Sequence, residues 1–75
     1  MINLPLVVKF RLAQLMADRD IHTVKELAPQ CGIDETTLGK IKRNRVAMIS
    51  LKNINRLCAA LKCAPGDLLS YEADP

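Results

Sequence analysis

Apolar residues recur at helical spacing along most of the chain, in segments that polar capping residues separate. The clearest segment is 24–43, which reads as two short helices joined by a tight turn. Leu27 of the first helix and Leu38 and Ile41 of the second fall on the faces that would meet. Gly32, between them, can adopt the positive φ that a sharp corner requires. The pattern therefore predicts a helix-turn-helix unit.

The second helix of this unit leaves a polar face outside. Asn44 can end the helix in a left-handed conformation. The outward positions recur at spacings of three and four residues and so share one face: Glu35, Thr36, Gly39, Lys40 and Arg43.

Short polar residues predict where the helices begin. Thr23 and Glu26 form a T-x-x-E capping box at the start of the helix-turn-helix unit. Asp34 and Ser50 are placed to cap the two helices that follow, and Pro65 suits the first turn of a last short helix.

Residues 1–10 allow two interpretations. Asn3 can cap a helix that continues to about residue 19, with a buried stripe of Leu4, Val8, Leu12, Leu15 and Met16. A strand-like alternation is also present, at Ile2, Leu4, Leu6, Val8 and Phe10. Such a strand would need a partner, which in so short a chain we would expect from a second subunit. We favour the helix, from about Leu6 onward.

The composition favours helices packed around an aliphatic core. The chain has 75 residues, of which 49% are hydrophobic, with one Phe and one Tyr. Aromatic and β-branched runs that would suit a sheet are few. The helix after Ser50 should bury a stripe of Leu51, Ile54, Leu57, Cys58 and Leu61. We therefore predict an all-α fold, a compact five-helix bundle forming a single domain over residues 1–75, with residues 71–75 as a tail.

Positive charge is concentrated in one part of the chain. The net charge is only +3, yet residues 40–62 carry seven Lys and Arg side chains and no Asp or Glu. A basic block that begins on the outer face of a helix-turn-helix is typical of a surface that faces phosphates. The alternative is a solvated face that keeps a small protein in solution, and the lack of acids within the block favours the first interpretation.

The chain has no sequence feature that would place it in or across a membrane. No apolar run approaches the roughly eighteen residues that a spanning helix needs. The first residues lack the basic leader and the cleavage site of a signal peptide. We therefore expect a cytoplasmic protein whose three cysteines stay reduced.

The sequence offers no set of catalytic or metal-binding residues. His22 is the single histidine, which leaves no Ser/His/Asp or Cys/His arrangement. Cys31, Cys58 and Cys63 would lack a fourth zinc ligand, and we expect them to behave as small core hydrophobes. No glycine-rich phosphate loop or catalytic carboxylate pair is present. We predict that the chain is not an enzyme and holds no metal or cofactor.

Three segments follow one another in the order helix, helix-turn-helix, helix and short helix: LAQLMADRDI, KELAPQCGIDETTLGKIKR and ISLKNINRLCAALKCAPGDLL. This order resembles the Cro/cI-type (lambda-repressor-like) DNA-binding domains of bacterial and phage regulators. The close of the chain, ALKCAPGDLLSYEADP, is similar to that of a subgroup of small stand-alone members.

The resemblance implies a mode of DNA binding. The helix beginning near Glu35 would enter the major groove, with base-contact candidates Glu35, Thr36, Gly39, Lys40 and Arg43. The start of the preceding helix and the basic block would hold the backbone, with phosphate-contact candidates Thr23, Val24, Lys25, Lys42, Arg45, Lys52 and Arg56. Three features depart from the family. Val24 stands where members often carry glutamine, and Gly39 leaves the middle of the reading face without a side chain. Asp34 and Glu35 place negative charge where the duplex would approach.

These features predict sequence-specific binding of double-stranded DNA by a transcriptional regulator. We expect a repressor, because the chain shows no second domain to recruit polymerase, and we predict no small-molecule effector. A homodimer on palindromic DNA is expected, since one short recognition helix reads few bases. The alternative is a protein-binding module, such as an antirepressor or an antitoxin-like partner, which would not require the basic block.

Overall fold

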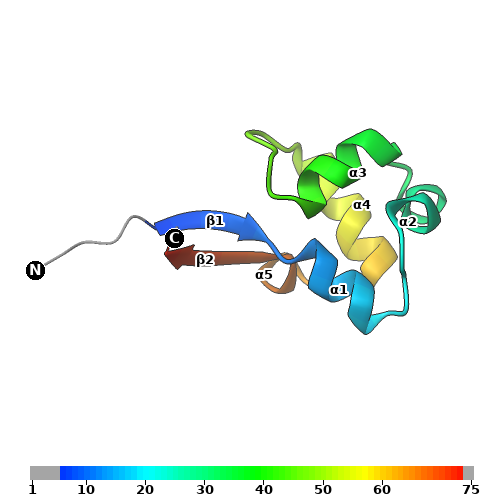
Figure 1. The fold of residues 1–75 in the computed structure, drawn as a ribbon, viewed down its shortest axis with the longest axis horizontal. Coiled ribbons are helices and arrows are strands. Elements are labelled where there is room, and N and C mark those ends of the chain that lie inside the picture. Colours follow the sequence, from blue (N-terminus) through cyan, green and yellow to red (C-terminus); the bar gives the residue numbers. More distant parts are fainter. Residues whose placement is uncertain (1–5, 74–75) are drawn as a thin grey trace, which may run out of the picture.

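The computed structural model describes residues 6–73 and places the helices in one body, from which a two-stranded ribbon projects (Figure 1). The elements in chain order are β1 (Leu6–Phe10), α1 (Leu12–Asp18), α2 (Val24–Cys31), α3 (Glu35–Lys42), α4 (Leu51–Leu61), α5 (Pro65–Leu68) and β2 (Leu69–Ala73). Five helices were predicted, and residues 6–73 contain five. Within residues 6–73, no helix combines the length and the hydrophobicity that crossing a membrane would require.

The all-α prediction is wrong, because β1 and β2 form an antiparallel two-stranded sheet. The register pairs Leu6 with Ala73, and Phe10 with Leu69. The predicted helix from Leu6 is therefore a strand, and α1 begins only at Leu12. The proposed cap Asn3 lies outside the described residues.

The strand-like alternation in residues 2–10 was the correct indication for the first segment, but the expected partner strand was wrong. The partner strand is β2 of the same chain and not a second subunit. Residues 71–73, predicted as part of a tail, belong to this strand. β2 also alternates, with apolar Leu69, Tyr71 and Ala73 separated by Ser70 and Glu72, so the signal was available.

Two sets of hydrogen bonds hold the base of the ribbon on the helical body. The backbone N–H of Arg11 donates to the carbonyl of Leu68 at 2.7 Å, which joins the start of α1 to the end of α5. The side-chain amide of Asn44, just beyond α3, accepts from the N–H of Phe10 at 2.5 Å and donates to its carbonyl at 3.2 Å. The backbone N–H and carbonyl of Phe10 that point away from β2 are thus both bonded to a side chain that follows the helix-turn-helix unit.

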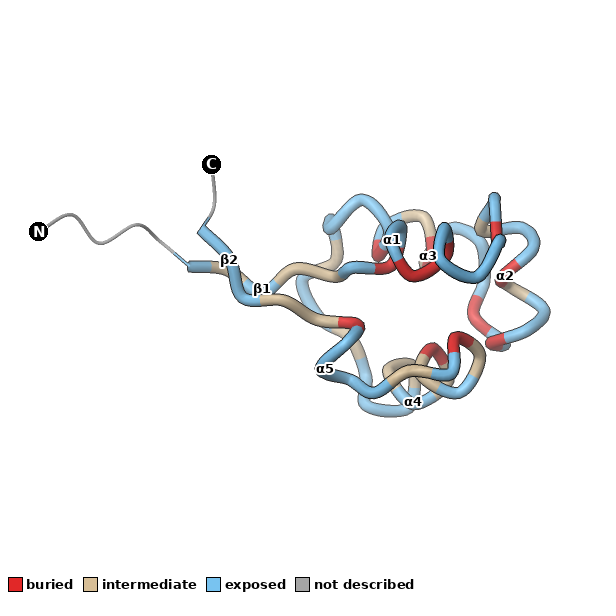
Figure 2. Tube along the Cα trace, turned by 90° about the horizontal axis from the view of Figure 1, so that it is seen from below, coloured by how far each residue is buried: buried red, intermediate tan, exposed pale blue. Residues whose placement is uncertain are grey.

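All five helices contribute to one apolar core, and in Figure 2 the buried stretches face the interior of the helical body. The predicted inward positions Leu12, Leu15 and Met16 of α1 are buried. Val8 and Leu51 were predicted in the core and are not: Val8 is 64% exposed because it lies on the ribbon, and Leu51 is 82% exposed at the first turn of α4. The buried residues are Leu12, Leu15, Met16, Ile21, Leu27, Cys31, Ile33, Leu38, Ile41, Leu57, Leu61 and Leu68.

The predicted starts of α2, α3 and α4 are confirmed. The side chains of Thr23, Asp34 and Ser50 accept hydrogen bonds from the backbone N–H groups three residues on, at 3.2, 3.0 and 3.1 Å. Each bond satisfies one of the free N–H groups of a helical first turn. Gly32 ends α2 with φ 72°, and Asn44 follows α3 with φ 57°, as the sequence predicted for both.

Candidate nucleic-acid interface

The α2–α3 pair is held in a fixed arrangement by the core beneath it. Leu27 from α2 and Leu38 and Ile41 from α3 have no exposed surface. Gly32 closes the corner by donating its N–H to the carbonyl of Ala28 at 2.9 Å. A corner with a left-handed residue and a buried face on each side leaves little freedom for α3 to reorient.

The outer face of α3 is free of other elements. Glu35, Thr36 and Lys40 are exposed, and so is Arg43 at the C-cap. Gly39 is half-buried. Helical geometry places Thr36 and Arg43 nearly opposite the buried Leu38–Ile41 face. The structure therefore brings the five predicted base-contact candidates together on one side of one helix.

The Arg43 side chain folds back over Gly39. A Cβ atom added at Gly39 would lie 3.5 Å from Nη2, 3.6 Å from Nη1 and 3.8 Å from Cζ of Arg43. The middle of the face is thus covered by a guanidinium, although the residue there has no side chain. The sequence indicated an empty position, and the geometry instead gives a planar cation lying along the helix.

At the N-terminus of α3, one carboxylate is engaged by the helix itself. Asp34 Oδ1 accepts from the hydroxyl of Thr37 at 2.7 Å, and Oδ2 accepts from its backbone N–H at 3.0 Å. The hydroxyl bond, followed by the backbone bond, lowers the pKa of Asp34 below its ordinary value. Asp34 therefore acts as a cap, as the sequence predicted, and Glu35 is the carboxylate of the outer face.

At the start of α2, the side chains of Thr23, Val24 and Glu26 already make contacts within the protein. Val24 is half-buried and packs against the core, so only its backbone N–H could donate a hydrogen bond to a phosphate. The Thr23 hydroxyl oxygen accepts the Glu26 amide, and Glu26 Oε2 accepts the N–H of His22 at 3.3 Å. Lys25 is exposed beside them. A phosphate here would meet one lysine and also the Glu26 carboxylate.

The remaining basic candidates divide into two groups. Lys42, Arg45 and Lys52 are exposed. Arg56 is half-buried on α4, and its Nη1 donates to the carbonyl of Gly32 at 3.5 Å. Arg56 therefore contacts the corner of the helix-turn-helix, a role that the sequence did not reveal, because spacing along α4 cannot show which element that face meets.

Comparison with known proteins agrees with this geometry. Residues 11–74 match the family described as the Cro/C1-type HTH DNA-binding domain. The chain belongs to this family. It is 36% identical over 52 residues to the uncharacterized HTH-type transcriptional regulator YozG of Bacillus subtilis (strain 168). That match covers 69% of this chain and 62% of the relative, so the chain spans less than two thirds of the relative's length. No solved structure matches the chain.

Membership in the Cro/C1-type family confirms two predictions from the sequence. The resemblance was correct, and the family is defined by a DNA-binding domain and not by an enzymatic reaction. The individual contact residues remain predictions that follow from the geometry above.

In this Cro/C1-type domain the three thiols are parts of the core. Cys31 is buried, and Cys58 and Cys63 are half-buried against the same cluster. Burial, followed by the neighbouring Cys58, raises the pKa of the Cys63 thiol above its ordinary value. Among residues 6–73, no three His, Cys, Asp or Glu side chains are grouped so that they could hold a metal ion.

Proposed function

We propose that this chain binds double-stranded DNA as a transcriptional regulator, with α3 in the major groove. The observation that carries the proposal is the outer face of α3, where Lys40 and Arg43 are exposed and no other element covers them. An α-helix fits the major groove of B-DNA, where base edges present distinct donors and acceptors. Arg43 and Lys40 would donate to guanine, and Glu35 would accept from cytosine.

Phosphate contacts would come from both sides of α3. Lys25 and the first N–H groups of α2 are suited to one strand of the backbone, and Arg45 and Lys52 are suited to the other. Lys42 adds a further exposed cation beside the groove. Thr23 can still donate its hydroxyl proton to a phosphate oxygen, because its capping bond uses only the oxygen as acceptor.

We further propose a homodimer that acts as a repressor. One recognition helix contacts only a few base pairs, and a two-fold dimer doubles the site by reading a palindrome. The half-site centres would lie about 34 Å apart, one turn of the duplex. A bound dimer would exclude other proteins from the site without needing a further domain.

The salt dependence of binding to duplex DNA tests the central proposal. Each phosphate that a Lys or Arg neutralises contributes about −0.9 to the slope of log affinity against log salt, so Lys25, Lys42, Arg45 and Lys52 predict a slope of about −4 per protomer. A flat dependence would favour the alternative of a protein-binding module. Selection of bound duplexes from a random pool would then give the preferred sequence.

Three variants locate the binding face. Arg43→Ala and Lys40→Ala should weaken binding to the selected duplex, by about 1–3 kcal/mol where the side chain pairs with a base. Lys62→Asn is the matched control, because it removes one exposed cation at the end of α4, and Asn tolerates the left-handed φ of 53° found there. Circular dichroism at 222 nm should be unchanged in all three. Equal affinities for Arg43→Ala, Lys40→Ala and wild type would refute the assignment of this face.

A further inference from the structure

The ribbon has one apolar face and one polar face. Directly paired residues of an antiparallel sheet lie on the same side. The register therefore places Leu6 and Ala73 on one side, together with the pairs Val8–Tyr71 and Phe10–Leu69. The other side carries the pairs Val7–Glu72 and Lys9–Ser70. We call the first side, which consists of Leu6, Val8, Phe10, Leu69, Tyr71 and Ala73, the apolar ribbon face.

Within residues 6–73, the outer half of the apolar ribbon face is uncovered. Leu6 is 50%, Val8 is 64% and Tyr71 is 68% exposed. At the base of the ribbon, Phe10 and Leu69 are half-buried, and Phe10 is packed against the core. The face therefore begins at the core and extends outward beyond any helix that could cover it (Figure 1).

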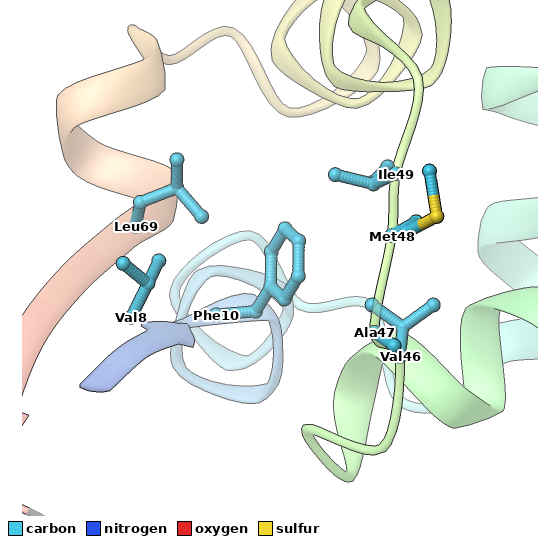
Figure 3. A pocket seen from close by; sticks show the side chains of 7 residues that line it. All are labelled: Val8, Phe10, Val46, Ala47, Met48, Ile49 and Leu69. Atoms are coloured by element: carbon cyan, nitrogen blue, oxygen red, sulfur yellow. The ribbon is translucent and has the colours of Figure 1, made fainter.

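This surface continues onto the segment after α3. Residues 46–49 and the base of the ribbon line a cleft of about 200 Å³. Figure 3 shows the ring of Phe10 between Val8 and Leu69 on one side and this segment on the other. Met48 on the segment is 87% exposed, and Leu51 at the start of α4 is 82% exposed. The five most exposed large apolar side chains of the described residues are thus those of the outer ribbon and of the residues that follow α3.

We propose that a second copy of this chain covers the apolar ribbon face, so that the two ribbons form the dimer interface. This inference deepens the dimeric state proposed above. A two-stranded sheet is marginally stable by itself in water and needs a further layer on its hydrophobic side. A second ribbon supplies such a layer.

The chemistry of the face fits a copy of itself. A two-fold interface uses the same surface of both copies, so that every contact it contains is made twice. Because none of the six residues is charged, self-association places no like charges together. The exposed side chains of the face itself, those of Leu6, Val8 and Tyr71, offer on the order of 350 Å², and the neighbouring Met48 and Leu51 bring the total to on the order of 600 Å², compared with the roughly 800 Å² per partner of a standard interface. None of these residues belongs to α3, so its outer face stays available.

Sedimentation equilibrium of the whole chain without DNA tests the inference, over a concentration range of about 1 to 100 μM. We expect a monomer–dimer equilibrium. Val8→Lys should raise the dimer dissociation constant on the order of 100-fold, because each of the two protomers would place one lysine in the apolar interface. Val7→Lys is the matched control: it adds the same charge to the polar ribbon face and should leave the dissociation constant near that of wild type.

A second pair of variants covers the case in which Val8→Lys unfolds. Tyr71→Lys on the apolar ribbon face should also give monomers, whereas Glu72→Lys on the polar face should still dimerise. Circular dichroism checks the fold of each variant. A wild type that is monomeric throughout, or a folded Val8→Lys or Tyr71→Lys variant that dimerises like wild type, would overturn the inference.

The outcome is separable from that of the proposed function. A dimer that fails to bind duplex DNA leaves the interface in place and removes the DNA-binding proposal. A wild-type monomer that binds DNA with the expected salt slope removes the interface alone.

Discussion

The side-chain amide of Asn44 gives the sharpest test of how the ribbon is attached to the helical body. It makes two hydrogen bonds to the backbone of Phe10, at 2.5 and 3.2 Å, while its own backbone is left-handed. Two substitutions separate these contributions. Asn44→Gly removes both hydrogen bonds and keeps an easy positive φ, whereas Asn44→Ala removes the bonds and also strains the backbone.

The expected magnitudes follow from this geometry. Each bond lies near the surface, so the low end of the net range applies, about 0.5 kcal/mol per bond. Asn44→Gly should therefore lower the free energy of unfolding by about 1 kcal/mol. Asn44→Ala should lower it by about 2 kcal/mol, because the left-handed conformation costs a further 1 kcal/mol or so. In a domain of this size, these losses correspond to drops in Tm of roughly 5 and 10 °C.

Urea unfolding followed by two probes measures the effect. Circular dichroism at 222 nm reports on the helices, and the fluorescence of Tyr71, the single tyrosine, reports on β2 in a chain without tryptophan. The fluorescence midpoint should fall at least as far as the helical midpoint, because the lost bonds anchor the ribbon. Asn44→Asp is the control, since it keeps an acceptor for the Phe10 N–H and should lose less than Asn44→Gly. An Asn44→Gly protein as stable as wild type would refute the reasoning, and equal losses for Gly and Ala would show that the left-handed backbone contributes nothing.

Three further predictions concern individual side chains. Gly39→Ala should stabilise the protein by up to about 1 kcal/mol in thermal unfolding, since the added Cβ meets Arg43 at ordinary contact distance; a loss of stability would show that the guanidinium cannot adjust. The lowered pKa of Asp34 means that its capping contribution is present above the unfolded pKa and is lost as the pH falls through the folded pKa. NMR should therefore show the amide of Thr37 shifting in acid, but not in Asp34→Asn. The raised pKa of Cys63 should make its alkylation at pH 8 slower in the folded protein than in urea, by mass spectrometry.

The helix-turn-helix could be read from the sequence because its determinants are local. Thr23, Gly32 and Asp34 act within a few residues of themselves, and each was assigned the role that the structure shows. The outward face of α3 follows from the same short-range spacing. The stretch that matches the family, residues 11–74, includes this unit.

The ribbon could not be read in the same way, because its determinants lie at opposite ends of the chain. The alternation at Leu6, Val8 and Phe10 is compatible with a strand but cannot identify its partner. The partner, Leu69–Ala73, alternates as well, but alternation within two separate segments does not show that they pair with each other. A third region of the chain also takes part, because the side chain of Asn44 forms hydrogen bonds with the backbone of Phe10 in β1.

The contact between Asn44 and Phe10 has a structural consequence for the recognition helix. α3 ends at Lys42 and Asn44 follows within two residues, so the base of the ribbon is fixed relative to the C-terminal end of α3. If two ribbons pack together, the distance between the two α3 helices is determined through this short connection and not through a flexible linker. Half-site spacing on DNA would then depend on the Asn44 side chain. An Asn44→Gly dimer should accordingly tolerate altered half-site spacing better than wild type, measured as affinity for palindromes lengthened by one or two base pairs. Equal sensitivity of the two proteins to spacing would show that the helices are positioned by other contacts.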